Sequence, residues 1–455
     1  MRPCVMAWVL VLCLGCGSRE ARIRNSLARG AGTVQLPPGV TEVSSELVIP
    51  EGTHNLVLAG SPSGSLIRAS AAFRGSALVR VKRGTNIRLT GFSIDGNRAA
   101  LSRPAGLAPS DVPFCRFTGN NGILAEDVQG LTISSIQLAE VAGFAVLVAR
   151  SSRVLIENIQ VDRSGSSSAA GRNNTTGGIL LEEGTSGFQV LNCTLRNVLG
   201  NGIWTHSLYT SPRNRDGRIS GNVLEDIGRD ALQAGHATGV RIENNSGRRI
   251  GYPPGVVDVE SGAIPVAIDT AGNVDKSVYA GNRFEEVNGK CIDLDGFHHG
   301  EVSRNSCVNR GSADDYPHGH YGIVFNNSNP DMESEDVLVT NNTIDGAKFG
   351  GIFIIGSRNR ITENVLRNLN LARCNDSGAK YGCLYYPEEP DLLRSGIYLG
   401  KGAHRQAPAR GNLVEGNQVS GYGMDSRCIA AAPGVSLAAN RLRANRCGGP
   451  LHPAR

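Results

Sequence analysis

Aromatic residues and lysine are both scarce in this sequence. Aromatics make up 5% of the 455 residues, and only six of the 46 basic residues are lysine. A core with so few rings must be thin and filled by Val, Ile and Leu, while 58 glycines favour tight turns. The net charge of +5 does not identify an acidic partner, because a general preference for arginine explains the basic residues equally well.

Several classes of protein are excluded by motifs that the sequence lacks. It contains no phosphate-cradling loop, no nucleophile elbow and no nucleic-acid-binding module. No stretch reaches the roughly 20 apolar residues of a transmembrane helix. We therefore expect no nucleic-acid partner, and contact with a membrane only through the N-terminus.

The N-terminus predicts export. Arg2 precedes an apolar run over residues 5–14, and the Gly15-Cys16 step that follows resembles the processing site of a bacterial lipoprotein. Residues 1–15 are then a signal peptide, and Cys16 is the lipidated first residue of a bacterial cell-envelope protein. Cys13 stands where such sites usually have leucine, so an ordinary signal peptide and secretion are the alternative.

One pattern recurs twelve times along the chain. An apolar reference residue is followed after three residues by asparagine or an apolar residue, and after five residues usually by another apolar residue. The reference residues are Leu89, Ile133, Ile156, Val190, Ile219, Ile242, Tyr279, Val302, Val339, Ile361, Val414 and Leu437. The asparagines are Asn222, Asn245, Asn282, Asn305, Asn342, Asn364, Asn417 and Asn440. The shortest spacing is 22 or 23 residues, and a period of roughly 20–50 residues indicates a solenoid.

The recurring asparagine is predicted to point inward and to stack on the asparagine of the next coil. Its amide can donate to one neighbour and accept from the other, as in the side-chain ladders of stacked sheets. A buried amide without partners would cost about 1–3 kcal/mol. The asparagine column is therefore expected to determine the register in which the coils stack.

The repeated unit, together with the opening residues 32–60, resembles the right-handed parallel β-helix repeat proteins of the pectate lyase-like superfamily. The resemblance implies an all-β fold, a single right-handed parallel β-helix of about 12 coils over residues 31–447. Residues 16–30 are predicted to form a tether and a short helix that covers the first coil, and residues 448–455 a tail. The family's activities are diverse, and carbohydrate is favoured by fold analogy alone.

A second strand precedes the asparagine strand in each coil, and its outer side is where chemistry is expected. Alternation turns its second and fourth residues outward. The predicted fourth-position column is Glu126, Ala149, Glu182, His206, Gly235, Asp269, Asp295, Asn326, Ile355 and Gly400. The second positions include Leu124, Leu180, Trp204, Gln233, Asp293, Val324, Phe353 and Tyr398. In this register Asp269 faces Asp295 about 4.8 Å away, and Asp293 lies roughly 6.6 Å from Asp295 along one strand.

The polar members of these columns form the candidate site. Asp269, Asp293 and Asp295 are predicted to be acid/base groups or Ca²⁺ ligands, because crowding raises the pKa of one carboxyl group and carboxylate oxygens suit Ca²⁺. His206 and His320 are predicted to be secondary acid/base groups or substrate contacts. The predicted substrate contacts are Glu182, Trp204, Asn326 and Tyr398, with Trp204 stacking on a sugar ring. The alternatives are that the carboxylates are only solvated and that Trp204 packs under the loop that follows it.

Loop histidines flank the same strands. His298 and His299 follow the strand of Asp293, and His318 and His320 precede the next one. A pair of this kind can supply two ligands to a metal, but no third ligand at a fixed spacing identifies zinc. The Gly-His step at residues 319–320 resembles part of the polygalacturonase arrangement. That family's adjacent aspartate pair and its Arg-Ile-Lys strand are missing, so specific pectin hydrolysis is not predicted.

Eight of the eleven cysteines lie beyond the N-terminal segment, and an exported protein can oxidise them. The pairs Cys374–Cys383 and Cys428–Cys447 are predicted to be disulfides. Cys307 occupies an inward position of the repeat and is predicted to be a small buried hydrophobic residue.

Together these features predict an exported carbohydrate-active protein, either a polysaccharide lyase or a glycoside hydrolase, that acts on the outer face of the β-helix. The alternative is a non-catalytic cell-surface protein that binds glycans or mediates adhesion through the same face. Long insertions around the second strand favour a binding face in both cases. We expect a polysaccharide as partner, Ca²⁺ as the cofactor that the carboxylates suit, and a monomer.

Overall fold

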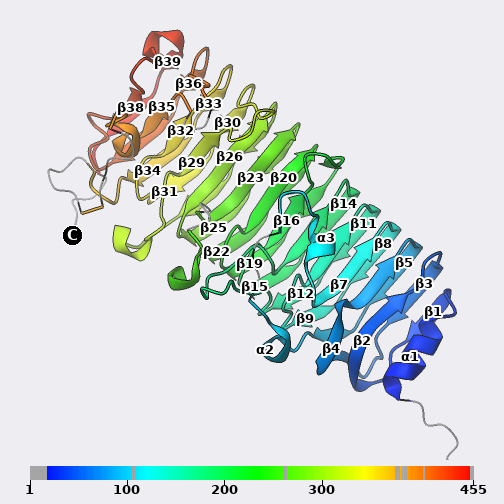
Figure 1. The fold of residues 1–455 in the computed structure, drawn as a ribbon. Coiled ribbons are helices and arrows are strands. Elements are labelled where there is room, and N and C mark those ends of the chain that lie inside the picture. The colour runs from blue at the N-terminus through cyan, green and yellow to red at the C-terminus, as the bar shows by residue number, and fades with distance from the viewer. Residues whose placement is uncertain are drawn as a thin grey trace, which may run out of the picture.

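The structure is a computed structural model that describes residues 18–450 apart from residues 105, 107, 260–263, 375–379, 382, 384–386, 403 and 404. In this part of the chain forty strands pair in parallel and stack along one axis, from α1 (Arg19–Leu27) at one end to β39 (Arg441–Arg443) at the other (Figure 1). Each full coil contributes one strand to each of three sheets. The predicted all-β fold, a single parallel β-helix with a short N-terminal helix, is confirmed.

We call the three sides of the solenoid the front, second and third sheets. The front sheet contains β7 (Asn121–Glu126), β10 (Val146–Ala149), β13 (Ile179–Glu182), β16 (Ile203–His206), β20 (Leu232–Thr238), β23 (Val266–Asp275), β26 (Lys290–His298), β29 (Ile323–Asn326), β32 (Ile352–Ile354), β35 (Ile397–Leu399) and β38 (Ile429–Ala431).

The second sheet, which carries the reference residues of the repeat, contains β1 (Gly32–Gln35), β3 (His54–Ala59), β5 (Thr85–Thr90), β8 (Gln129–Ser134), β11 (Ser152–Glu157), β14 (Ser186–Leu191), β18 (Arg218–Ser220), β21 (Arg241–Glu243), β24 (Val278–Ala280), β27 (Glu301–Ser303), β30 (Leu338–Thr340), β33 (Arg360–Thr362), β36 (Leu413–Glu415) and β39.

The third sheet contains β6 (Ser93–Asp95), β9 (Gln137–Ala139), β12 (Gln160–Asp162), β15 (Thr194–Val198), β19 (Val223–Ile227), β22 (Ser246–Ile250), β25 (Arg283–Val287), β28 (Ser306–Val308), β31 (Thr343–Asp345), β34 (Val365–Leu369), β37 (Gln418–Gly421) and β40 (Arg446–Gly448). The long strands β2 (Gly39–Ile49) and β4 (Ser65–Lys82) bend between sheets, and β17 (Asn214–Arg215) pairs with both β14 and β20.

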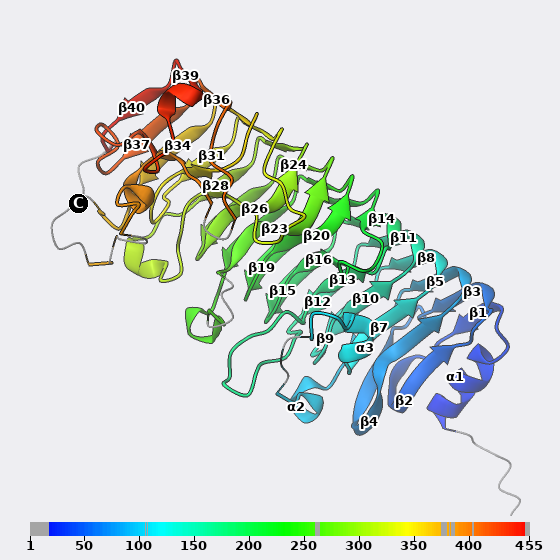
Figure 2. The same cartoon turned by 45° about the horizontal axis from the view of Figure 1, so that its top comes forward.

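Short helices lie outside the coils. They are α2 (Arg98–Leu101), α3 (Phe114–Phe117) and the 3₁₀ turns η1 (Pro254–Val256), η2 (Ala313–Asp315), η3 (Leu392–Arg394) and η4 (Leu437–Ala439). Figure 2 shows α3 beside β7, on the outside of the front sheet. No helix among the described residues is long and apolar enough to cross a membrane.

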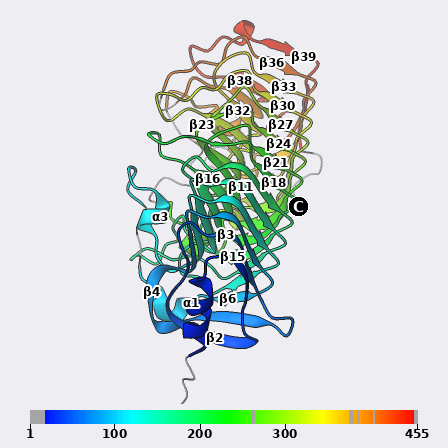
Figure 3. The ribbon, with the colours of Figure 1, turned by 90° about the vertical axis from the view of Figure 1, so that its right-hand side faces the viewer.

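The first coil is covered by α1, close to the predicted position (Figure 3). Ile23 and Leu27 are buried against it, and the Ser18 hydroxyl accepts from the Ala21 N–H at 3.1 Å, which caps the helix start. Covering the first coil protects an edge of parallel strands that would otherwise invite further pairing. The predicted signal peptide at residues 1–15 and the predicted lipidation site Cys16 lie outside the described residues.

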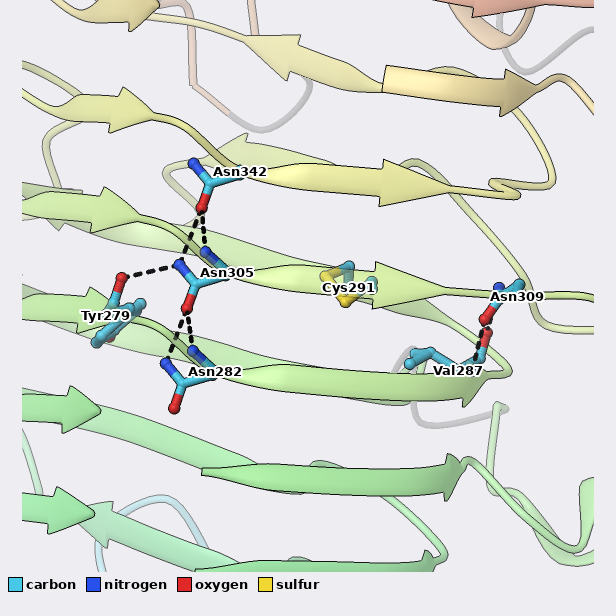
Figure 4. Close-up of a disulfide and its surroundings, with 8 residues drawn as sticks. Tyr279, Asn282, Val287, Cys291, Asn305, Asn309 and Asn342 are labelled. Carbon is cyan, nitrogen blue, oxygen red and sulfur yellow. Dashed lines mark hydrogen bonds between the residues drawn. A yellow bond between two sulfur atoms is a disulfide. The ribbon is translucent and has the colours of Figure 1, made fainter. Parts of the chain in front are cut away.

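The asparagine ladder runs through the corner between the second and third sheets. Seven of the eight predicted asparagines stack in one column, and amide N–H groups donate to amide oxygens at 2.8–3.0 Å. The amide nitrogen of each of these donors also donates to a main-chain carbonyl, as that of Asn305 does to Tyr279 (Figure 4). The residue before the ladder asparagine turns the corner with positive φ, as at Asn244 and Asn341.

The last step of the ladder differs from the prediction. Asn417 donates to Asn445 at 2.9 Å, because β39 places Leu442, and not Leu437, beside Val414. Asn440 instead ends a second ladder at another corner, formed with Asn412 and Asn359. The error arose because Leu437 and Leu442 both fit the repeat, and only pairing with β36 distinguishes them.

Three disulfides cross-link the C-terminal half. The predicted pairs Cys374–Cys383 and Cys428–Cys447 are both present. The prediction for Cys307 was wrong, because this residue is bonded to Cys291 inside the solenoid, between the front and third sheets (Figure 4). Both cysteines point inward from their strands, so the pair replaces a core contact with a covalent bond.

Candidate active site

The outer side of the front sheet is apolar at both ends and polar in the middle. Towards the N-terminus, Leu124, Leu147, Leu180 and Trp204 form a small core with Phe114 of α3. Towards the C-terminus, Val324 and Tyr398 pack with the η3 segment. Between these flanks, successive second positions hold Gln233, Asp269 and Asp293. The middle coils therefore present polar groups where the flanking coils complete a core.

Asp269 belongs to a different column from the predicted one. Ile268 pairs with both Leu232 and Ile292, which places Asp269 beside Gln233 and Asp293. Asp295 pairs with Ala271, so the predicted contact between Asp269 and Asp295 is wrong. The prediction took Val266 as the first inward residue of β23. In the structure Ile268, two residues later, pairs with the first inward residues of β20 and β26. The sequence hides this shift because residues 266–268 are all apolar.

Three carboxyl groups on the middle coils interact electrostatically, and we call Asp230, Asp269 and Asp293 the acidic cluster. Each is only 6–8% exposed. Asp230 stands just before β20 and accepts from the Val266 N–H at 3.0 Å. Asp269 accepts from the Gln233 amide at 2.5 Å, and Gln233 in turn accepts from Asn201 at 2.9 Å. A chain of carboxamides thus positions the carboxylate of Asp269.

Burial and mutual repulsion raise the pKa of every member of the acidic cluster. Burial is the largest cause at Asp269, followed by the charges of Asp230 and Asp293, and its pKa lies well above the usual value. Burial likewise raises the pKa of Asp230 to about 6 although Arg229 opposes the shift. The pKa of Asp293 is raised less far, because Lys290 counters its burial. The environment therefore favours the protonated form more strongly at Asp269 than at Asp293.

Lys290 neutralises one side of the cluster. Its Nζ forms a short ion pair with Oδ2 of Asp293, and both side chains are nearly buried. Burial alone would lower the pKa of Lys290, but the neighbouring carboxylates outweigh it and the net shift is upward. Oδ1 of Asp293 is buried and makes no hydrogen bond in the described part of the chain. One carboxylate oxygen is therefore anchored by Lys290, and the other is buried without a hydrogen-bond partner among the described residues.

Asp295 and Asn326 lie in the fourth-position column, and their side chains bind the loop that follows β29. Asp295 accepts from the N–H of Ser328 at 2.9 Å and also from its hydroxyl group. Asn326 accepts from the N–H of Asn327 at 2.9 Å. Both side chains thus hold the start of the insertion at residues 327–336, and Asp295 is not part of the acidic cluster.

Two predicted substrate contacts are covered by α3. Glu182 is fully buried and accepts from the N–H groups of Phe114 and Cys115 at 2.9 and 2.6 Å. Trp204 is 6% exposed and packs edge-on against Phe114, with ring centroids 4.9 Å apart. Neither side chain can meet a sugar while α3 lies there. Trp204 packs under the insertion before β7, and not under the loop that follows it.

Two more predicted residues do not suit their predicted roles. Tyr398 is fully buried, and its hydroxyl group donates to Glu389 at 3.0 Å. Burial, together with Lys290 and Lys348, lowers the pKa of His320 to about 3, so the ring is neutral at physiological pH. His320 therefore cannot serve as a general acid in this environment.

His206 keeps an exposed edge. Its side chain is 26% exposed, and Nδ1 lies 3.9 Å from the Glu182 carboxylate. The ring also lies 5.1 Å from that of Trp204. His206 therefore borders the apolar flank and stays within reach of a ligand over the middle coils.

The three aspartates predicted to bind Ca²⁺ do not converge. Within the described ranges, the groups of three or more possible ligand atoms within 4.8 Å of one another include none of Asp269, Asp293 and Asp295. The carboxylate of Asp295 is occupied by Ser328, and that of Asp293 by Lys290. A Ca²⁺ ion held by all three would need these contacts to break.

Sequence reasoning missed Asp230 and Lys290. Asp230 stands two residues before its strand, as Asn201 does one coil earlier, and the Asp230 N–H group donates to Asn201 Oδ1 at 3.4 Å. A polar residue at the same place in successive coils is a signal that the sequence contains. Lys290 is one of only six lysines in the chain and stands three residues before Asp293. A lysine at this place in so arginine-rich a sequence is a signal that could have drawn attention to it.

Comparison with known proteins agrees with the fold. Residues 85–258 match the family model described as right handed beta helix region. PfbA, a surface adhesin of Streptococcus pneumoniae, is 15% identical, with a TM-score of 0.54 over 77% of this chain and 86% of that one. The bacteriophage Phi29 gene product 12 N-terminal fragment is 14% identical, with a TM-score of 0.57 over 92% and 68%.

An enzyme is also among the similar structures. The DFA-IIIase from Arthrobacter chlorophenolicus A6, solved in complex with GF2, is 13% identical, with a TM-score of 0.50 over 93% of this chain and 92% of that one. No curated protein matches the sequence. At these identities the likeness concerns the fold.

Proposed function

We infer the function from two premises: the chain is a right-handed parallel β-helix protein, and its front sheet carries an acidic cluster between two apolar flanks. We propose that it hydrolyses glycosidic bonds of a polysaccharide over the middle coils. The similar structures include both an enzyme and an adhesin, so the fold alone does not choose between catalysis and binding. The acidic cluster favours catalysis.

The observation that carries the proposal is the unequal pair on adjacent strands. Asp269 has the more strongly raised pKa, so it acts as the general acid that protonates the leaving oxygen. Asp293, anchored through Oδ2 by Lys290, presents Oδ1 as the base or nucleophile. Two carboxyl groups held in opposite protonation states are what glycoside hydrolysis requires. Such a protonated carboxyl group favours hydrolysis over the elimination that a polysaccharide lyase catalyses.

The decisive experiment is a product assay. The purified protein is incubated with a panel of acidic and neutral glycans, with and without a chelator. Hydrolysis releases new reducing ends, and we expect Asp293→Asn to lower the rate about 10²–10⁴-fold. Asp216→Asn is the matched control, because Asp216 is an exposed aspartate outside the front sheet, and this variant should keep full activity.

Other products would contradict the proposal. Unsaturated products that absorb in the ultraviolet indicate a lyase. Full activity of Asp293→Asn would exclude the acidic cluster as the site.

The second candidate is a non-catalytic glycan-binding or adhesion protein. It is favoured by the low exposure of the acidic cluster, at 6–8% for each member, which leaves little of the carboxyl groups to a bulky substrate. Glycan binding measured by calorimetry, without any released product from the whole panel, would support this candidate and reject hydrolysis.

Export and anchoring are part of the same proposal. An N-terminal lipid on Cys16 would place the solenoid as a monomer on the bacterial cell envelope. Expression of the full chain should then place the protein in the membrane fraction, and Cys16→Ser should release it. An unchanged distribution would reject the anchor and leave the proposed hydrolysis untouched.

A further inference from the structure

A cluster of metal-ligating groups lies outside the acidic cluster, where β26 ends. His298 and His299 place their Nδ1 atoms 2.8 Å apart. Glu333, from the insertion at residues 327–336, brings its carboxylate to 3.6 Å from His298 Nδ1. The ligand atoms of these three residues all lie within 4.8 Å of one another. Two histidines and a carboxylate thus converge from two separate segments.

The protonation state of His298 follows from its other nitrogen. Nε2 lies 3.0 Å from Oδ1 of Asn273. The amide orientation of Asn273 is determined, because its Nδ2 donates to the Asp331 carbonyl and its Oδ1 accepts from Arg213 at 2.9 Å. Nε2 of His298 must therefore carry the proton, and in the neutral ring Nδ1 presents a lone pair.

The same reasoning applies to His299. Its Nε2 lies 3.3 Å from Oδ2 of Asp336, so this nitrogen carries the proton. Nδ1 of His299 then also presents a lone pair, which faces that of His298. Two lone pairs at this distance repel each other unless a cation lies between them, and that cation is either a proton or a metal ion. Histidines whose second nitrogen donates to an amide or a carboxylate are also the usual ligands of metal ions.

We propose that His298, His299 and Glu333 bind a divalent transition-metal ion such as Zn²⁺. Imidazole nitrogen with one carboxylate is a donor set that suits Zn²⁺, and three protein ligands leave a fourth position for water. Zn–N bonds of about 2.0–2.1 Å at a tetrahedral angle separate the nitrogens by about 3.3 Å. His299 is about half exposed and can move the required distance of roughly 0.5 Å.

A neighbouring set of ligands shares His299. It consists of His299, Glu335 and Asp336. Both of these carboxylates are already paired with Arg358, at 2.7 Å each, and a guanidinium group opposes a cation. The ion pair that the structure gives Glu333 is with His298 itself. The site is therefore assigned to Glu333 and not to Glu335.

The metal joins two segments that border the acidic cluster. Glu333 belongs to the insertion whose Ser328 is held by Asp295. His298 ends the strand that carries Asp293, five residues earlier. A bound ion therefore cross-links the far end of this insertion to β26. Its role is structural and independent of the proposed hydrolysis.

The test measures Zn²⁺ binding to the full chain after dialysis against a chelator. We expect one Zn²⁺ per chain by calorimetry, and tetrahedral absorption bands when Co²⁺ replaces it. His298→Ala and Glu333→Gln should each weaken binding at least tenfold, because even loss of an outer hydrogen-bond partner costs roughly 10–100-fold. Glu335→Gln and His54→Ala, an exposed histidine on β3, are the matched controls and should bind as the unsubstituted chain does.

Three results would overturn the site. Absence of stoichiometric Zn²⁺ binding would show that a proton alone bridges the two rings. Equal affinity of Glu333→Gln, whose exposed side chain makes misfolding no concern, would remove the third ligand. Loss of binding in Glu335→Gln, with Glu333→Gln unaffected, would assign the ion to the neighbouring set.

Discussion

The middle and the flanks of the front sheet are built on the same coils, yet they use the same outward position in opposite ways. On the flanks Trp204 and Tyr398 are buried under α3 and η3, so this position stabilises the protein. In the middle Asp269 and Asp293 are almost as deeply buried, but they are carboxyl groups that oppose each other's ionisation. One position thus completes a core on both flanks and holds ionisable groups in the middle, which is the contrast expected if the proposed site lies there.

The largest effect is expected on the N-terminal flank. Trp204→Ala should lower the free energy of unfolding by about 3–5 kcal/mol, because it removes a buried ring that contacts Phe114 and leaves a cavity. Urea unfolding followed by circular dichroism measures the change. A loss below 1 kcal/mol would mean that α3 does not hold this flank, and that Trp204 is open to a ligand after all.

The next prediction concerns the asparagine ladder inside the coils, which is remote from the front sheet. Asn282→Ala should lower the free energy of unfolding by about 1–3 kcal/mol, because it removes the oxygen that accepts from the Asn245 amide and the amide that donates to Asn305. Glycan cleavage per folded molecule should stay unchanged. Arg88→Ala, an exposed position on β5, is the control and should shift the unfolding midpoint very little.

The middle should respond in the opposite direction. Asp269→Asn removes a buried ionisable group that interacts unfavourably with Asp230 and Asp293, and it keeps an oxygen that can accept from Gln233. We expect the free energy of unfolding at pH 7 to rise by about 0.5–2 kcal/mol while hydrolysis is lost. Parallel unfolding and activity measurements on this variant check both halves. A destabilised variant would show that Asp269 is a structural residue.

The last prediction concerns the pH dependence of stability. The folded pKa of Asp230 is raised to about 6, from about 3.9 in an unfolded chain. The unfolded state therefore releases its proton first, so stability is fully present below about pH 4 and falls as the pH rises towards 6. Asp230→Asn should reduce this fall. Unfolding midpoints at pH 4, 5, 6 and 7 test it, and parallel curves for the two proteins would contradict the raised pKa.

The repeat made most of the scaffold predictable. Eleven of the twelve reference residues align as predicted, from Leu89 on β5 to Val414 on β36. The inward asparagines form the expected hydrogen bonds, and two disulfide pairs were recognised from their spacing. These features depend on contacts between neighbouring coils at equivalent positions, and such contacts leave a period in the sequence.

The candidate site was less predictable because it depends on insertions. The approach of α3 to Glu182 and Trp204 joins segments 67 residues or more apart, and no repeat in the sequence indicates it. The pairing of Cys291 with Cys307 links two sheets within one coil. The tautomers of His298 and His299 depend on Asn273 and Asp336, which reach them from other strands and loops.

The sequence by itself determined that this chain is a β-helix and which residues face outward, because a period of two along each strand and of about 22 along the chain are local properties. Only the tertiary structure decided which outward residues share a column. The two-residue offset of β23 moves Asp269 from Asp295 to Asp293. That offset is set by hydrogen bonds to β20 and β26, and an apolar run such as residues 266–268 satisfies more than one register equally well.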